Sequence, residues 1–185
     1  IVTGGAGFIG SHTYVELINA GHEAVIVDNL YNASEKVLDR LAEITGKPVT
    51  FCNADVADKE AMRAIFAAHA FDAVIHFAGY KAVGESVHKP LEYYSNNLIS
   101  TLVLLNAMRA HGVKNFVFSS SATVYGDPAS VPIREDFPTG GTTNPYGTTK
   151  LFLERVLMDY CAADPSLNVA LLRYFNPIGA HKSGL

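Results

Sequence analysis

The sequence predicts an α/β fold in which a doubly wound parallel sheet carries helices on both faces. Short apolar segments alternate with longer segments of helical periodicity along the whole chain, and this alternation is typical of repeated strand–helix units. The first apolar segment runs directly into a turn that contains Gly4, Gly7 and Gly10. Such a turn is typical of the first unit of these sheets, so the expected strand order is 3-2-1-4-5-6.

The first unit consists of a strand, the glycine turn and a helix. Ile1-Val2 belong to the strand, and the helix is expected to run from Phe8 until Gly21 stops it. The first glycine of the turn allows a tight bend, the second lets the backbone approach a pyrophosphate, and the third lets the helix pack on the strand. Because a helix N-terminus binds anions, the turn predicts a dinucleotide phosphate site.

An acidic residue ends the second expected strand. This strand covers residues 24–27, and Asp28 follows it. A carboxylate here can bind both hydroxyls of the adenine ribose and would repel a 2′-phosphate, which favours NAD over NADP. The alternative role for Asp28 is a helix cap or a turn. Asn29, Asn32 and Ala33 extend the same turn and are expected to border the adenosine.

The middle of the chain continues the alternation. Strands are expected over residues 49–52, 72–79 and 115–118, and helices over 35–46, 58–70 and 90–111. The segment 72–79 is nearly all apolar, as parallel strands buried on both faces are, so we expect His76 to be a core histidine. Ala78-Gly79 at its end leave room for a cofactor. Residues 81–86 are expected to form an exposed loop.

Three polar residues in these units are candidates for cofactor binding. Asp55 follows the third strand and is expected either to bind the adenine amino group or to be an exposed loop residue. Asn96 and Asn97 lie inside the 90–111 helix, although asparagine is a mediocre helix former. One of them is therefore expected to hydrogen-bond the cofactor, with an exposed helix face as the alternative.

Hydroxyl groups follow the fifth strand, in Ser119-Ser120-Ser121-Ala122-Thr123. They lie at the edge where open α/β sheets bind ligands, so one of these serines is expected to bond a substrate oxygen. Residues 126–144 contain several prolines and glycines and are expected to form a long loop, and long loops in compact domains are often functional. A sixth strand over 168–173 is expected to end beside the same edge.

A Tyr–Lys pair opens the helix expected over residues 145–161. Tyr146 and Lys150 are four residues apart, so they project from one face of this helix. A nearby ammonium favours the phenolate and lowers the pKa of a phenol from its usual value of about 10. The pair can therefore act as an acid/base catalyst. Two unrelated surface residues are the alternative, but the glycine turn and the serines point to the same pocket.

Composition argues against several other classes of protein. The formal net charge is −4 and no basic run is present, so neither nucleic acid nor a membrane is an expected partner. The seven histidines form no metal-ligand spacing, and we expect no metal site. Cys52 and Cys161 are isolated, which indicates idle thiols in a reducing cytoplasm. The chain opens inside a strand and stops in a loop-like stretch, so we expect it to be a piece of a longer protein.

Together these motifs resemble the extended short-chain dehydrogenase/reductase superfamily and, within it, the UDP-glucose 4-epimerases. The resemblance rests on the glycine turn, Asp28-Asn29-Leu30, the segments 76–86, 89–94 and 118–126, Asn144-Pro145-Tyr146-Gly147, Lys150, and the segment 172–177. It covers the whole chain. It implies that residues 1–185 form a Rossmann NAD-binding domain with the catalytic tyrosine and lysine, and that a C-terminal substrate domain lies outside this chain.

The resemblance also implies a mechanism and a set of site residues. Tyr146 would be the catalytic base, Lys150 its partner and Ser121 the residue that hydrogen-bonds the sugar 4-hydroxyl, with a 4-keto sugar as transient intermediate and NAD tightly bound. The expected cofactor contacts are Gly4, Gly7, Phe8, Ile9, Gly10, Asp28, Asn29, Asn32, Ala33, Asp55, Val56, Phe77, Ala78, Gly79, Lys81, Asn96, Ser119, Tyr146, Lys150 and Phe175. The expected substrate contacts are Lys81, Ser121, Ala122, Thr123, Tyr146 and Asn176.

Three other functions are alternatives to UDP-glucose/UDP-galactose interconversion. One is a 4-epimerase of another UDP-sugar, such as a pentose or an N-acetylhexosamine. The second is a nucleotide-sugar 4,6-dehydratase, whose family carries an Asp-Glu pair after the threonine, where this chain has Val124-Tyr125 after Thr123. The third is a non-catalytic NAD-binding sensor, which would not need the Tyr–Lys pair.

A homodimer is a further expectation. The helices expected over 90–111 and 145–161 carry apolar residues beyond one core face, namely Leu102, Leu105, Phe152 and Val156. The two helices are therefore expected to pair across a two-fold axis as a four-helix interface, with burial in the core as the alternative.

Overall fold

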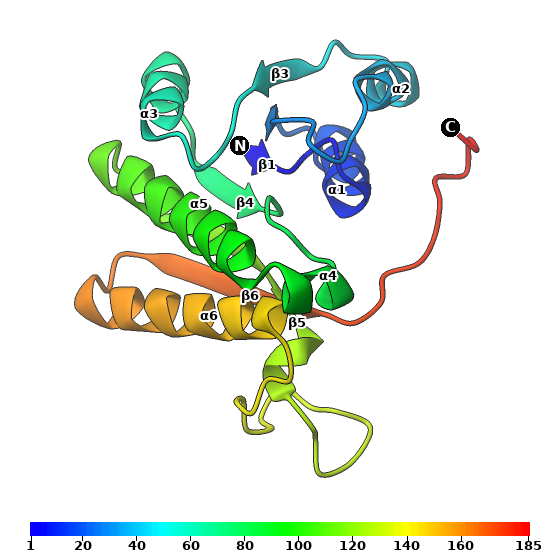
Figure 1. The fold of residues 1–185 in the computed structure, drawn as a ribbon. Helices are drawn as coiled ribbons and strands as arrows, with labels where there is room; N and C mark the ends of the chain where they lie inside the picture. The colour runs from blue at the N-terminus through cyan, green and yellow to red at the C-terminus, as the bar shows by residue number, and fades with distance from the viewer.

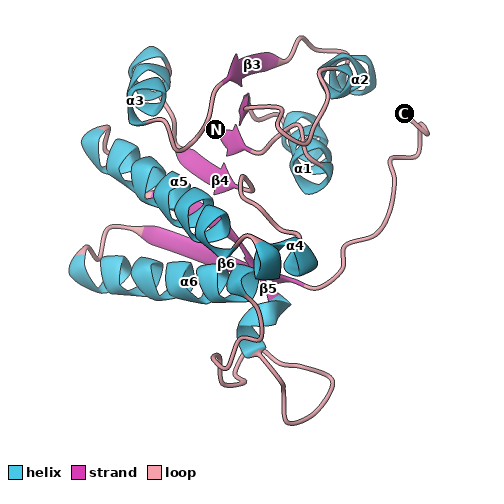
Figure 2. Cartoon of the chain, viewed as in Figure 1, coloured by secondary structure: helices cyan, strands magenta, loops and turns pink.

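A computed structural model describes all residues, 1–185, and contains one six-stranded parallel sheet. The strands are β1 (Val2–Thr3), β2 (Val25–Asp28), β3 (Thr50–Asn53), β4 (Ala73–His76), β5 (Asn115–Ser121) and β6 (Asn168–Tyr174). Their order is β3-β2-β1-β4-β5-β6, and every neighbouring pair is parallel. Figure 2 shows the strands enclosed between helices. The predicted fold class and strand order are confirmed.

Helices cover both faces of this sheet. The helices are α1 (Phe8–Asn19), α2 (Lys36–Thr45), α3 (Lys59–Ala68), α4 (Val83–His88), α5 (Pro90–Ala110) and α6 (Pro145–Ala163). α1 and α2 lie on one side, and α3, α5 and α6 on the other (Figure 1). α4 and a short 3₁₀ helix, η1 (Ala122–Tyr125), occupy connections between strands and helices. None of the helices combines the length and the apolar character that crossing a bilayer requires.

Two apolar clusters fill the spaces between the sheet and these helices. The larger lies under α3, α5 and α6 and includes Phe116, Phe118, Leu104 and Leu157. The smaller lies under α1 and α2 and includes Tyr14, Ile26 and Leu41. Successive residues of a strand point to opposite faces. The central strands therefore have a partner layer on each side. In β6 only one face packs against the core, and Ala170 and Leu172 on the other face are exposed.

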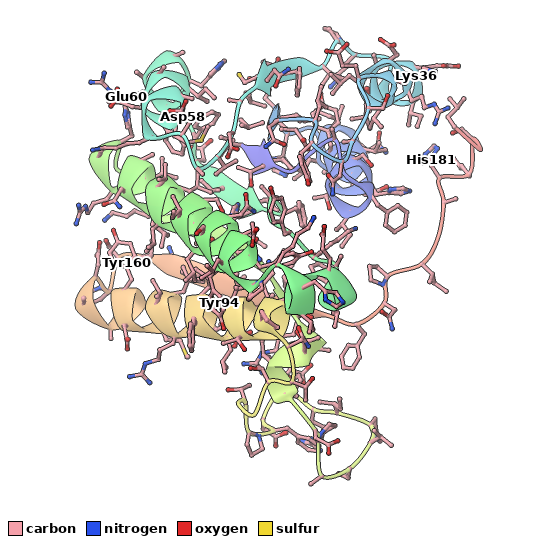
Figure 3. The ribbon with its side chains drawn as sticks, viewed as in Figure 1. Lys36, Asp58, Glu60, Tyr94, Tyr160 and His181 are labelled. Carbon is pink, nitrogen blue, oxygen red and sulfur yellow. The ribbon has the colours of Figure 1, made fainter.

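Side chains cap the helices that lead into the site. Asp58 accepts hydrogen bonds from the backbone N–H groups of Glu60 and Ala61 at the start of α3, as predicted (Figure 3). Asn144 does the same for α6, where its Oδ1 lies 2.8 Å from the N of Gly147. Pro145 occupies the first position of α6, where its missing N–H has no cost. The start of α6, and with it Tyr146, is thereby fixed.

The loop predicted over residues 81–86 is wrong for residues 83–86, which belong to α4, although residues 81–85 are exposed as predicted. Glu85 accepts hydrogen bonds from Lys89 and from the phenol of Tyr93, and Tyr93 in turn accepts one from the N–H of Ala82. Contacts with the following helix therefore stabilise a turn of helix that local periodicity does not predict.

Two predicted strands have different lengths in the structure. The strand predicted over 72–79 ends at His76, so Ala78 and Gly79 belong to the loop that follows β4. The strand predicted over 115–118 continues to Ser121, paired with β6 as far as Tyr174. Serine is accommodated at this end because Ser120 donates a hydrogen bond to the carboxylate of Glu154.

Candidate active site

A cavity of about 530 Å³ runs along the C-terminal ends of the parallel strands. This is the edge at which open α/β sheets bind ligands. The predicted site residues that line it are Gly4, Gly7, Phe8, Ile9, Gly10, Asp28, Asn29, Asn32, Asp55, Val56, Phe77, Ala78, Gly79, Lys81, Asn96, Ser119, Ser121, Ala122, Thr123, Tyr146, Lys150, Phe175 and Asn176. Ala33 is the exception, since it is not among the lining residues.

The glycine turn forms one wall of the cavity and admits no side chains. Gly4 has a φ of +67°, and a Cβ on it would lie 2.6 Å from the N of Ala78. A Cβ on Gly10 would lie 2.3 Å from the O of Gly4. No side chain caps α1 at Gly7, so the first N–H groups of the helix remain available to a ligand. The turn therefore presents backbone donors at close range, as an anion site requires.

Two carboxylates lie beyond the turn. Asp28 is buried and accepts hydrogen bonds from the N–H of Ala6 at 3.1 Å and that of Leu30 at 2.9 Å. It therefore ties the glycine turn to the end of β2 and keeps lone pairs for a ligand. Asp55 accepts from the N–H of Ala57 and from the side chain of Asn29, which holds the loops after β2 and β3 together.

Lys150 is buried at the other end of the cavity. Its Nζ lies 2.7 Å from the carbonyl O of Ser119 and 4.8 Å from the centre of the Phe118 ring. An ammonium has three N–H donors, so two remain for a ligand. Burial lowers the pKa of Lys150 to about 8, because desolvation disfavours the charged form.

Tyr146 lies one turn before Lys150, with the Nζ of Lys150 5.9 Å from the centre of its ring. Burial raises the pKa of Tyr146, and a hydrogen bond from Ser121 partly offsets this because it stabilises the phenolate. The lowered pKa expected from Lys150 alone is thus not found. Desolvation is the larger effect in the protein by itself, so a further positive charge is needed to favour the phenolate.

His76 lies in the core behind these residues, as predicted. It is 1% exposed, and its two ring nitrogens are paired with the hydroxyls of Thr3 at 2.6 Å and Thr101 at 3.0 Å. Burial, followed by the charge of Lys150, lowers the pKa of His76 to about 3. It is therefore neutral and links β1, β4 and α5.

The adjacent asparagines of α5, Asn96 and Asn97, have different positions. Asn97 is buried and hydrogen-bonds both the N–H and the C=O of Tyr80, and it also donates to the hydroxyl of Thr149. It thus holds the loop after β4 against α6. Asn96 lines the cavity, with its Nδ2 donating to Oδ1 of Asn97 at 3.1 Å, and its side-chain oxygen is available to a ligand.

Some lining residues were not predicted from the sequence. They are Ala54, Val83, Ser100, Tyr174 and Pro177. Tyr31, Tyr80 and Ser120 also line the cavity, and they lie within segments that the sequence had already placed there. Ser100 follows Asn96 by four residues on α5, so helical spacing from a predicted contact would have identified it. Val83 lies in α4, which the sequence did not predict.

The fold and the site define the class of protein. A doubly wound sheet, a glycine turn open to an anion, a buried acid after β2 and a Tyr–Lys pair at one edge are the features of a Rossmann protein of the short-chain dehydrogenase/reductase type. Residues 1–184 match the NAD dependent epimerase/dehydratase family. The chain belongs to this family.

Individual relatives match all or nearly all of the chain. It is 61% identical over 184 residues to the UDP-glucose 4-epimerase of Bacillus subtilis. The structure of the Bifidobacterium longum UDP-glucose 4-epimerase in complex with NAD+ and UDP aligns over 99% of this chain, with 61% identity and a TM-score of 0.97. The UDP-Glc/GlcNAc 4-epimerase of Campylobacter jejuni aligns over 94%, with 38% identity and a TM-score of 0.89. The chain spans about half the length of these relatives, 54%, 55% and 52% in turn.

Proposed function

We propose that the protein containing this chain interconverts UDP-glucose and UDP-galactose by NAD-dependent 4-epimerisation. The observation that carries the proposal is that Tyr146, Ser121 and Lys150 share one cavity with the glycine turn and Asp28. The high identity to UDP-glucose 4-epimerases over the whole chain supports it. Because the chain covers about half of those relatives, the activity belongs to the longer protein.

The residues of the cavity fit NAD. The close backbone approach at Gly4 and Gly10, together with the uncapped start of α1, suits a pyrophosphate. Asp28 would bind the hydroxyls of the adenine ribose, and the two free N–H donors of Lys150 would bind those of the second ribose. When bound, NAD supplies a two-electron acceptor that takes hydride from C4 of the sugar and returns it to the opposite face.

The acid/base work falls to Tyr146. Its phenol oxygen takes the proton of the sugar 4-hydroxyl and later gives it back, so the protein ends each turnover in its starting protonation state. Ser121 donates a hydrogen bond that stabilises the phenolate. The ammonium of Lys150 adds a nearby positive charge. Both effects oppose the burial that raises the pKa of Tyr146.

The proposal includes a second domain and a cellular compartment. The substrate nucleotide would be held by a C-terminal domain outside this chain. The two free cysteines, Cys52 and Cys161, agree with a reducing compartment, and we place the protein in the cytoplasm.

We further propose a homodimer formed through α5 and α6. Leu102 is 43% and Phe152 49% exposed. Tyr94 extends this apolar surface, with its ring 6.3 Å from that of Phe152 (Figure 3). Leu105, expected on the same surface, lies in the core instead, and Val156 packs against the core. Sedimentation of the full-length protein tests the proposal, and a monomer would contradict it.

The first experiment uses the full-length protein with no NAD added. It receives UDP-galactose, and UDP-glucose is followed by NMR. Conversion without added cofactor is the expected result, since the cofactor is neither consumed nor released. Absence of conversion, with NAD recovered from the denatured protein, would move the proposal to another UDP-sugar. Absence of conversion together with absence of bound NAD would contradict the prediction that the glycine turn and Asp28 bind a dinucleotide.

The alternatives differ in what they need from the site. The Campylobacter relative, named for both UDP-Glc and UDP-GlcNAc, keeps a second UDP-sugar as a candidate substrate. A dehydratase needs an additional acid and base near Tyr146, but Val124 and Tyr125 are buried outside the cavity. The cavity's only carboxylates are Asp28 and Asp55, at the opposite end from Tyr146. A sensor would not need Tyr146 for its function.

A further inference from the structure

Thr123 makes two hydrogen bonds to a single atom, the Oγ of Ser121. Its backbone N lies 3.2 Å from this oxygen and its Oγ1, which donates, lies 3.0 Å away. A hydroxyl oxygen has two lone pairs and one proton. Both lone pairs of Ser121 are therefore in use, and its own proton is the hydrogen-bonding capacity that remains.

Thr123 also packs against the helix that carries Tyr146. A Cβ placed on Gly147, the residue after Tyr146, would lie 3.1 Å from both Cβ and Oγ1 of Thr123. That separation is tighter than most Cβ contacts, so a side chain at this position would require Thr123 to shift by a few tenths of an ångström. Asn144 fixes the same turn through its bond to the N–H of Gly147. Thr123 thus contacts both Ser121 and the backbone next to Tyr146.

We propose that Thr123 is a positioning residue, which holds the oxygen of Ser121 and leaves the Ser121 proton directed at the phenol oxygen of Tyr146. The inference rests on the proposed function, since it concerns the same acid/base group. It gives Thr123 a role in addition to the substrate contact that the family resemblance implies. Thr123 lines the cavity, and in this role its hydroxyl acts on turnover through Ser121.

The charge on Tyr146 explains why this arrangement matters. A hydrogen bond donated to the phenolate stabilises the charged form and lowers the pKa of the phenol. Ser121 supplies that bond against the effect of burial. If the hydroxyl of Ser121 rotated freely, its proton would point at Tyr146 only part of the time, and the pKa of Tyr146 would rise.

The first test compares two variants of the full-length protein in turnover of UDP-galactose. Thr123→Val removes the donor hydroxyl and keeps the shape and the backbone N–H, whereas Thr123→Ser keeps the hydroxyl. We expect Thr123→Val to lower kcat by about 10-fold, the upper range for one neutral hydrogen bond, with KM nearly unchanged. Thr123→Ser should restore kcat. An unchanged kcat, or a raised KM as the main effect, would overturn the proposal.

A double-mutant cycle separates action through Ser121 from direct action. Thr123→Val is introduced into a protein that already carries Ser121→Ala. Because residues that act as a unit are not additive, we expect the second substitution to cost less than about twofold in kcat. The same 10-fold loss in both backgrounds would show that Thr123 acts independently of Ser121, and the proposal would fail.

A titration tests the inference without any turnover. Tyrosines of the full-length protein are labelled with ¹³C, and Tyr146→Phe identifies the resonance of Tyr146. We expect the pKa of Tyr146 to be higher in Thr123→Val than in the wild type and to return in Thr123→Ser. If UDP-galactose is not converted, the proposed function fails while this titration still decides the role of Thr123. An unchanged pKa would contradict it.

Discussion

Glu154 and Arg173 form a buried ion pair between α6 and β6, with Nη2 of the arginine 2.8 Å from Oε2 of the glutamate. A second bond joins Nε to Oε1 at 3.0 Å, so the pair is bidentate. Arg173 also donates to the phenol of Tyr125, and Glu154 accepts from Ser120. Tyr146, Lys150 and Glu154 follow one another at intervals of four residues on α6. The ion pair therefore anchors the helix face that carries the proposed acid/base pair.

Removal of the arginine should destabilise the protein more than neutralisation of the glutamate. The side chain of Glu154 is 1% exposed and that of Arg173 is 20% exposed. Arg173→Leu leaves a buried carboxylate without its partner, which costs about 3–5 kcal/mol. Glu154→Gln leaves the guanidinium of Arg173, which water reaches, without its partner, so the loss in free energy of unfolding should be smaller. Urea unfolding of the full-length protein measures both.

The same helix offers a matched control for this comparison. Arg155 pairs with Asp159 at 3.1 Å, but these side chains are 73% and 62% exposed. Arg155→Leu should change the free energy of unfolding by less than about 1 kcal/mol, because surface ion pairs contribute little. An equal loss for Arg155→Leu and Arg173→Leu would mean that burial of the pair is not what makes it important.

Two Gly→Ala substitutions, one in the glycine turn and one in α4, should have opposite effects on stability. In Gly10→Ala the new Cβ would meet the O of Gly4 at 2.3 Å, so the turn and the start of α1 must move apart. We expect the full-length protein to lose bound dinucleotide and stability. Gly84→Ala is the control, because nothing lies within 4 Å of its Cβ and α4 is helical there. It should raise stability by about 0.5–1 kcal/mol. Unfolding and dinucleotide release, measured together, check both.

The strand order and much of the cavity could be predicted because their signals are local. Alternation of apolar strands with amphipathic helices defines the sheet, and parallel strands bring their carboxyl ends to one edge. The glycine turn, Asp28 and Tyr146 were therefore expected at this edge, and they line one cavity. Spacing alone placed Lys150 on the same helix face as Tyr146.

Features that depend on distant contacts were not predictable in this way. α4 contains Gly84 and has no apolar stripe, and it is held by the bond between Glu85 and Tyr93. β5 extends through Ser120 because its hydroxyl reaches Glu154, 34 residues away. The raised pKa of Tyr146 also has no sequence signal, since it depends on how deeply α6 is packed.

Tyr146→Phe should separate catalysis from cofactor binding. The substitution removes one oxygen and keeps the ring, so NAD should remain bound to the full-length protein. Loss of a positioned acid/base group lowers the rate by about 10²–10⁴-fold. Tyr94→Phe is the control, because its phenol lies on α5 outside the cavity. Turnover of UDP-galactose and dinucleotide released on denaturation are the two measurements. Full activity in Tyr146→Phe would assign the proton transfer to another group.

Lys150 should make stability depend on pH in a defined window. Burial lowers its pKa in the folded protein from 10.5 to about 8. Between these values the unfolded chain holds the proton and the folded protein does not, so the free energy of unfolding rises with pH by up to about 3 kcal/mol. Below pH 8 both states are protonated, and this group gives no slope.

Comparison with Lys150→Met isolates this effect from the tyrosines that titrate in the same range. The difference in unfolding free energy between the wild type and Lys150→Met, both freed of dinucleotide, should be flat below pH 8 and rise above it. Lys36→Met, at an exposed position on α2, is the matched control (Figure 3). Parallel curves for the wild type and Lys150→Met would mean that the buried ammonium keeps its ordinary pKa. The two N–H donors of Lys150 would then be satisfied within the protein, because an unsatisfied buried ammonium must lose its proton more readily.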